Sequence, residues 1–199
     1  MKDQGKYQPL SYFQLMEVTL RELLVEKGIL SEEEIAQEVE AMRNRGYERG
    51  SRVVAHAWLD PGFKARLLQN GTQACEELGL EIPGLKLLVV ENTNEVHNAI
   101  VCTLCSCYPR MLLGIPPDWY KSRSYRSRMV REPRAVLNEF GLSIPEQVQI
   151  RIHDSSADMR YMVLPMRPAG TETWSEERLA GLVNRDCLLG VAVPKGPKD

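Results

Sequence analysis

Three cysteines lie within six residues near the middle of the chain, where residues 101–107 read Val-Cys-Thr-Leu-Cys-Ser-Cys. The Cys-x-x-Cys spacing lets Cys102 and Cys105 direct two sulfurs at one ion, and the Cys-x-Cys spacing adds Cys107 as a third. The same tight turn brings the backbone nitrogens of Ser106 and Cys107 close to that ion, and a sufficiently acidic metal could deprotonate them. Three thiolates and two amide nitrogens make five donors and leave a sixth position open. The segment therefore predicts a metal site with room for a substrate.

The metal itself is not fixed by the spacing alone. A donor set this strong favours a small trivalent ion, cobalt or iron, over zinc or magnesium. An open position on such an ion can polarise a substrate or lower the pKa of bound water. A structural zinc site would need a fourth ligand, which His97 or His153 could supply. An iron–sulfur cluster would need a fourth cysteine, either Cys75 or Cys187.

The overall composition excludes several other classes of protein. The 25 Lys and Arg residues are offset by 27 Asp and Glu residues, so nothing indicates a nucleic-acid partner. No apolar run is long enough for a membrane span, and the polar start of the chain lacks the apolar segment of a secretory signal. We therefore expect a cytoplasmic protein. A reducing compartment argues against a disulfide framework for the five cysteines.

The elements that must position the cluster begin with two helices. The first has its apolar residues on one stripe and is closed by Gly28. Ser31 followed by Glu34 is a capping box that starts the second. The polar residues 43–50 contain two glycines and are interpreted as a hinge. We predict an N-terminal helical arm over residues 1–50 and a metal-binding catalytic domain over residues 51–199.

The predicted body mixes helices and strands. One strand is expected over 85–90 and a second over 96–101, ending directly at Cys102. Residues 148–152 alternate as a half-buried strand does, and 161–164 are expected to form its neighbour. Helices are predicted over 53–58, from Asp60-Pro61 to about 70, from Thr72 to 79, over 119–130, over 133–140, and from Ser175 onward. The fold class is α+β, with a helical arm followed by a layered α/β body.

Residues 101–107 resemble the metal-claw signature of the nitrile hydratase α-subunit family. Thr103, after the first cysteine, is similar to the cobalt branch of that family. The resemblance extends from about residue 20 to residue 193, with matching segments in order at 53–71, 91–93, 114–119, 125–128, 133–134, 139–141, 154–156 and 167–171. It implies the layered α-subunit fold and one cobalt(III) ion per subunit in preference to iron(III).

The resemblance also implies a role for each claw residue. Cys102 would be the axial thiolate, Cys105 the cysteine oxidised to sulfinate, and Cys107 the one oxidised to sulfenate. Ser106 and Cys107 would supply amide nitrogens, and both would take part in catalysis, because the sulfenate oxygen and the Ser106 hydroxyl lie near the substrate. The implied reaction adds water to a nitrile to give an amide. In this family β-type subunits of a hetero-oligomer supply arginines to the oxidised cysteines, and a metallochaperone is a further expected partner.

One position departs from the usual pattern of that family. The last cysteine is generally followed by Tyr-Pro-Trp or Thr-Ala-Trp, whereas this chain has Arg110 at the third position. A guanidinium in the substrate pocket favours a polar or anionic ligand. The related thiocyanate hydrolase catalytic subunit is similar here and again over 185–194, so conversion of thiocyanate to carbonyl sulfide and ammonia is the alternative function. A non-catalytic zinc-binding module is the third hypothesis.

Three polar residues near the predicted strand 148–152 also bear on the cluster. Asp154, Asp158 and Arg160 could orient the claw through hydrogen bonds or could form an ordinary turn with an ion pair. The two isolated cysteines, Cys75 and Cys187, are interpreted as buried thiols.

Overall fold

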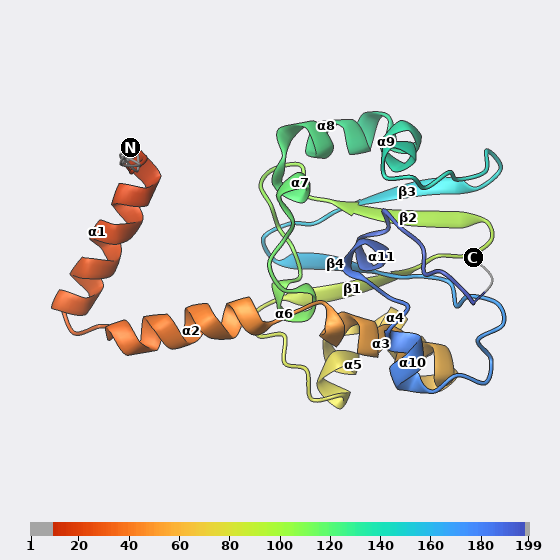
Figure 1. Ribbon diagram of the computed structural model, residues 1–199, viewed down its shortest axis with the longest axis horizontal. Helices are drawn as coiled ribbons and strands as arrows, with labels where there is room; N and C mark the ends of the chain where they lie inside the picture. Colours follow the sequence, from red (N-terminus) through yellow and green to blue (C-terminus); the bar gives the residue numbers. More distant parts are fainter. Residues whose placement is uncertain (1–9, 198–199) are drawn as a thin grey trace, which may run out of the picture. The chain divides into compact units, whose positions relative to one another are not determined.

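A computed structural model describes residues 10–197 of the chain. Helices and strands are mixed, and the strands form small parallel sheets, which confirms the predicted α+β class (Figure 1). The chain divides into two compact units between Met42 and Arg43. Within the described residues, no helix is both long and apolar enough to cross a membrane.

The first unit contains helix α1 (Tyr12–Glu26) and most of helix α2 (Glu32–Asn44). The predicted capping box is present at the start of α2. The Glu34 amide donates to Ser31 Oγ at 3.1 Å, and the Ser31 amide donates to Glu34 Oε2 at 2.8 Å. Because α1 buries none of its residues, these helices rely on local capping rather than on a core of their own.

Four parallel-paired strands form the centre of the second unit. Strand β1 (Lys86–Glu91) pairs with β4 (Met159–Leu164), and β2 (Val96–Val101) pairs with β3 (Gln149–Asp154). Figure 1 shows them one above another in the order β3, β2, β4, β1. The expectation that 161–164 lies beside 148–152 is therefore wrong. Alternation of apolar residues identifies a buried face, but it does not identify the neighbouring strand.

The four residues between β3 and β4 carry the chain from one sheet to the other. At the start of this link the Ser155 amide donates to the Val101 carbonyl at 2.8 Å, and at its end the Lys86 amide donates to the Asp158 carbonyl at 3.0 Å. The ends of β2 and β3 therefore lie close to the starts of β1 and β4. Cys102 follows β2 at this edge.

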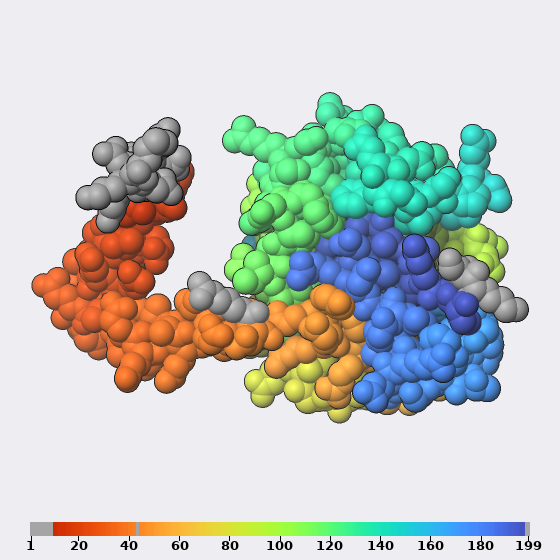
Figure 2. Space-filling view, viewed as in Figure 1, coloured from red at the N-terminus to blue at the C-terminus, as the bar shows by residue number. Residues whose placement is uncertain are grey.

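Helices pack around the strands. Below β1 in Figure 1 lie α3, α4, α5 and α10, and above β3 lie α8 and α9. Figure 2 shows the C-terminal segment, in blue, covering the middle of the visible face, where α11 packs against β4. The helices of this unit are α3 (Glu48–Leu59), α4 (Pro61–Gln69), α5 (Gly71–Glu77), α6 (Arg110–Leu113), α7 (Asp118–Lys121), α8 (Arg123–Arg131), α9 (Pro133–Glu139), α10 (Glu176–Ala180) and α11 (Arg185–Leu189).

Two helix boundaries differ from the sequence prediction because a capping residue was misjudged. The single helix expected over 119–130 is interrupted at Ser122, whose hydroxyl oxygen accepts from the Tyr125 amide and starts α8. Asn70, rather than Thr72, caps α5. The Thr72 hydroxyl instead accepts from the Leu87 amide at 2.8 Å and ties α5 to β1.

The core holds β2 firmly up to the cysteine cluster. Ala99, Ile100 and Val101 are fully buried, and so is Cys102. The Tyr125 hydroxyl donates to the Ile100 carbonyl at 2.7 Å from α8. The first cysteine of the cluster is therefore anchored by a packed strand.

The C-terminal helix is also two helices where one was expected. The helix that starts at Ser175 ends at Ala180, and α11 begins separately after its cap, Asn184. Helix α11 is followed by its C-terminal cap, Gly190, which has φ 78°. A Cβ added there would lie 2.0 Å from the Asn98 carbonyl oxygen on β2. Only glycine allows this approach.

We expect Gly190→Ala to destabilise the chain by about 3 kcal/mol, because left-handed backbone strain and a clash with β2 act together. Thermal unfolding followed by circular dichroism measures the effect. Gly181→Ala is the matched control, because Gly181 has φ −62° and its added Cβ would lie no closer than 3.4 Å to another group. Equal melting temperatures for the two variants would contradict the role assigned to Gly190.

Candidate metal centre

The sulfurs of the three clustered cysteines converge on one point. Cys102 Sγ lies 3.4 Å from Cys105 Sγ, and Cys105 Sγ lies 3.1 Å from Cys107 Sγ. All three sulfurs are within 4.8 Å of one another. No histidine, aspartate or glutamate of the described residues joins this group. The arrangement suits one ion held from one side by thiolates.

The three thiols have different surroundings. Cys102 is buried, Cys105 is exposed and Cys107 is half-buried. Hydrogen bonds from Cys107 and then Cys102 lower the pKa of Cys105 to about 7. Burial, followed by the hydrogen bond to Cys105, raises the pKa of Cys107 to about 12. Of these two thiols, Cys105 therefore forms the thiolate more readily, and the thiolate is the form that binds metals and reacts with oxidants.

Side chains from other elements hold the cysteine turn in place. The carboxylate of Asp154, at the end of β3, accepts hydrogen bonds from the Thr103 amide at 2.9 Å and from the Thr103 hydroxyl at 2.5 Å. From α7, the Tyr120 hydroxyl donates to the Cys107 carbonyl at 2.8 Å. Asp154 therefore orients the cysteine turn through hydrogen bonds, which is one of the two roles that the sequence analysis considered for it. Tyr120 was missed, because a single tyrosine in a helical segment carries no distinguishing signal.

A cavity of about 340 Å³ opens beside the cluster, and two arginines are among the residues that line it. Arg110 starts α6 and is exposed, while Arg160 comes from β4. The positive charge of Arg160 acts to lower the pKa of Cys107, against the larger effect of burial. An anion or a polar molecule would fit this wall better than an apolar one. The lining residues are Leu85, Cys105, Ser106, Cys107, Tyr108, Arg110, Met111 and Arg160.

The residues proposed as a fourth ligand for zinc or for an iron–sulfur cluster lie elsewhere. His97 Nε2 is 2.8 Å from the Gly190 carbonyl oxygen, and His153 Nε2 is 2.8 Å from an asparagine side chain on β2. Burial lowers the pKa of both histidines. Cys75 and Cys187 are buried, as expected, and burial raises the pKa of both thiols. None of these four residues joins the cysteine cluster.

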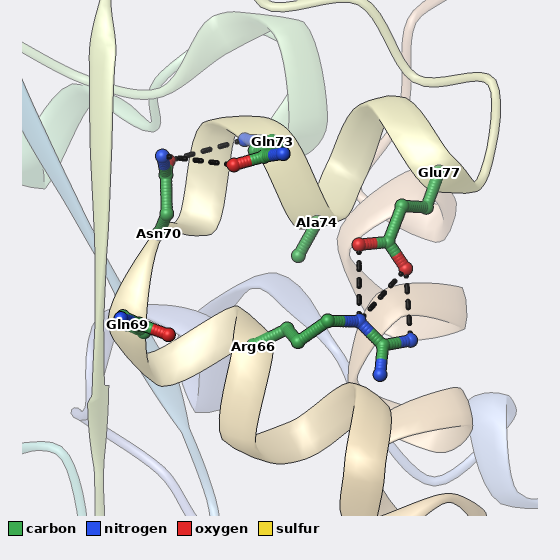
Figure 3. A pocket seen from close by; sticks show the side chains of 6 residues that line it. All are labelled: Arg66, Gln69, Asn70, Gln73, Ala74 and Glu77. Carbon is green, nitrogen blue, oxygen red and sulfur yellow. Dashed lines mark hydrogen bonds and ion pairs between the residues drawn. The ribbon is translucent and has the colours of Figure 1, made fainter.

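A separate polar cavity of about 390 Å³ lies between α4 and α5 (Figure 3). Arg66 spans it and binds Glu77 through Nε at 3.1 Å and Nη2 at 2.9 Å. At the other end of the cavity, Asn70 caps the start of α5. Because these groups satisfy one another, this cavity offers no converging reactive side chains.

We expect Asp154→Asn to weaken metal retention by about 10–100-fold, because the neutral amide is a weaker acceptor for the two Thr103 donors that orient the turn. Equilibrium dialysis against a chelator measures the loss. Asp118→Asn is the control, since the Asp118 carboxylate binds Lys121 at the surface. Equal retention by the two variants would show that Asp154 does not orient the site.

Comparisons with known proteins agree with this geometry. A family model described as the alpha chain of nitrile hydratase matches residues 11–192. The low-molecular weight cobalt-containing nitrile hydratase subunit alpha of Rhodococcus rhodochrous is 53% identical over 177 residues, which cover 88% of this chain and 86% of that protein. Thiocyanate hydrolase subunit gamma of Thiobacillus thioparus is 43% identical over 198 residues, covering 94% and 82%.

Solved structures give the same result. An Fe-type nitrile hydratase from Comamonas testosteroni, solved as a double mutant, superposes with a TM-score of 0.87 at 44% identity, covering 96% of this chain and 94% of that one. The matched region contains the whole cysteine cluster and both sheets. The chain belongs to the nitrile hydratase alpha-chain family.

Proposed function

We propose that this chain is the catalytic subunit of a cobalt-type nitrile hydratase, which adds water to a nitrile to give an amide. The observation that carries the proposal is the convergence of three cysteine sulfurs within 4.8 Å beside an open cavity. The sulfurs of Cys102, Cys105 and Cys107, with the amide nitrogens of Ser106 and Cys107, would hold cobalt(III). We propose cobalt because a similar protein is named as cobalt-containing. Iron(III) is the second choice, because a similar solved structure is an Fe-type enzyme.

The bound ion would supply Lewis acidity at its open position. Side chains of this chain would supply the nucleophile or base and would orient the substrate. Cys107, as the sulfenate, would attack the substrate carbon or take a proton from the attacking water, and its partly buried position limits competing solvent. The Ser106 hydroxyl lines the same cavity and is proposed to orient the substrate.

Oxidation of the claw can be tested directly by mass spectrometry of the peptide that contains residues 105–107. In the active, cobalt-loaded protein we expect two added oxygens on Cys105 and one on Cys107, because both are metal-bound thiolates near solvent. Cys75 is the internal control and should stay unmodified, since it is fully buried. An active, cobalt-loaded sample with unmodified Cys105 and Cys107 would contradict the proposed chemistry.

Members of this family work in multi-subunit enzymes, and we propose β-type partner subunits that supply arginines to the oxidised cysteines. We also propose that residues 1–50 act as a helical arm and residues 51–199 as the catalytic domain. Support for the arm as a partner contact comes from α1, whose Phe13 is 78% exposed and whose Leu20 is 59% exposed. Exposed apolar stripes of this kind mark interaction surfaces. A metallochaperone for cobalt loading completes the proposed partners.

A second candidate function is hydrolysis of thiocyanate to carbonyl sulfide and ammonia. The specific observation that favours it is the pair of guanidinium groups, from Arg110 and Arg160, in the wall of the cysteine cavity. Guanidinium groups suit an anion, whereas a neutral nitrile gains less from them. The thiocyanate hydrolase gamma subunit is also among the relatives.

One experiment separates these functions. The complex purified with its partner subunits is analysed for metal and then incubated with a nitrile and with thiocyanate. Stoichiometric cobalt and amide formation without carbonyl sulfide support nitrile hydration, whereas carbonyl sulfide supports the second function. Stoichiometric zinc with three unoxidised cysteines and neither product would overturn both and support the non-catalytic zinc module.

A further inference from the structure

Helix α8 presents an unusual basic face to the outside. The helix carries four arginines and no acidic residue, and it packs Tyr125 and Met129 into the core. Arg123 and Arg126 are three residues apart, and Arg131 lies eight residues after Arg123, which is about two helical turns. They therefore form one continuous side of the helix.

This side of α8 forms a hollow of about 670 Å³ together with the cysteine turn. Leu104, which lies between Cys102 and Cys105, is 88% exposed there, and Val130 is 51% exposed. Arg126 Nη1 donates to the Thr103 carbonyl at 3.4 Å and joins the helix to the turn. We call this surface the α8 face; its residues are Thr103, Leu104, Arg123, Arg126, Ser127, Val130 and Arg131.

The charges of the α8 face are not neutralised within the chain as far as the structure describes it. The fourth arginine of the helix, Arg128, binds Glu132 and Glu139, each at 2.5 Å. Arg123, Arg126 and Arg131 form no ion pair among the described residues. Since the whole chain has a net charge of −2, the basic face is a local feature rather than a property of the composition.

We propose that the α8 face docks an acidic segment of a partner subunit. Carboxylates would bind Arg123, Arg126 and Arg131, because arginine pairs with carboxylates through two parallel hydrogen bonds. An apolar side chain of the same segment would cover Leu104 and Val130, since arginine around an apolar centre is typical of protein interfaces. A single small anion would leave both apolar side chains exposed, and the face has no aromatic ring on which a nucleic-acid base could stack.

Docking there has a consequence for the cysteine cluster. Thr103 and Leu104 lie between the first two cysteines, so the docked segment covers this part of the turn, while Asp154 holds Thr103 through hydrogen bonds. The proposal uses only the multi-subunit character of the family and not the cobalt chemistry. The tests below therefore measure assembly of the complex and do not depend on its enzymatic turnover.

The first test places a photo-crosslinking amino acid at Val130 in the purified complex. After irradiation, mass spectrometry should identify a peptide from a different subunit that is rich in Asp and Glu. The same probe at Leu59, on α3 and 42% exposed, is the control and should give a different peptide or none. Crosslinks to another copy of this chain, to a segment without acidic residues, to nucleic acid, or to nothing would overturn the proposal.

The second test reverses charge on the face. Arg123→Glu with Arg131→Glu should weaken assembly by at least about tenfold, measured as dissociation of the complex during a sodium chloride titration. Arg52→Glu with Arg151→Glu changes the net charge equally at exposed positions elsewhere and should leave assembly unchanged. Equal assembly of the two double variants would contradict the proposal.

A third variant controls for misfolding, and a charge swap tests whether the contact is direct. If circular dichroism shows that the reversed variant is unfolded, Arg123→Gln with Arg131→Gln replaces it, and the same weakening in smaller measure is expected. Changing the crosslinked acidic residues of the partner to arginine should restore binding to the reversed variant. Failure of this rescue would show that the contact is not a direct pairing of charges.

Discussion

Replacing Cys107 with alanine should lower turnover of the assembled enzyme by more than about 100-fold. Loss of a residue that only hydrogen-bonds to a metal ligand lowers activity by up to about 100-fold, and loss of a ligand should have a larger effect. Cys107 is proposed both as a ligand and as the carrier of the reactive oxygen, so its loss removes two functions at once. Steady-state hydration of a nitrile, normalised to cobalt content, measures the effect.

Cys75→Ala is the matched control for this variant. It also removes a thiol, but Cys75 lies in the core, where burial raises its pKa to about 12. We expect turnover per cobalt to be unchanged in this control. A Cys107→Ala enzyme that keeps full turnover would defeat the assignment of the catalytic residue.

Replacing Arg110 with tryptophan should raise the preference for a neutral nitrile over thiocyanate by about 10–100-fold. A hydrogen bond to a charged group contributes about 1.5–3 kcal/mol, and the loss of the guanidinium weakens binding of the anion more than binding of the neutral nitrile. The structure supports this effect because Arg110 lines the cysteine cavity together with Arg160. The measurement is the ratio of kcat/KM for the two substrates in the purified complex.

Arg110→Lys keeps the positive charge and should change that ratio much less. If tryptophan and lysine leave the ratio equal to that of the parent enzyme, Arg110 does not contact the substrate. Arg160→Met then becomes the variant of interest, because it removes the other guanidinium of the same wall.

The parts of the fold that depend on local spacing were predictable from the sequence. Residues 96–101 form the strand that was expected, and Asp60 caps α4 with Pro61 at its first position. The convergence of the cysteine sulfurs follows from the Cys-x-x-Cys-x-Cys spacing alone, because three sulfurs on one tight turn have little choice of direction.

Features that depend on distant segments were not predictable in the same way. The Asp154–Thr103 hydrogen bonds join residues 51 positions apart, and the pairing of β4 with β1 brings together the first and last described strands along the chain. Arg160 reaches the cysteine cavity only because the link after β3 crosses to the other sheet. Composition and periodicity carry no information on such contacts.

We propose that the three clustered sulfurs hold one cobalt ion, and cobalt K-edge X-ray absorption of the purified complex identifies the atoms bound to that ion. We expect three sulfur neighbours from Cys102, Cys105 and Cys107 in the first coordination shell, with lighter nitrogen or oxygen neighbours beside them. A first shell made only of nitrogen and oxygen would contradict it.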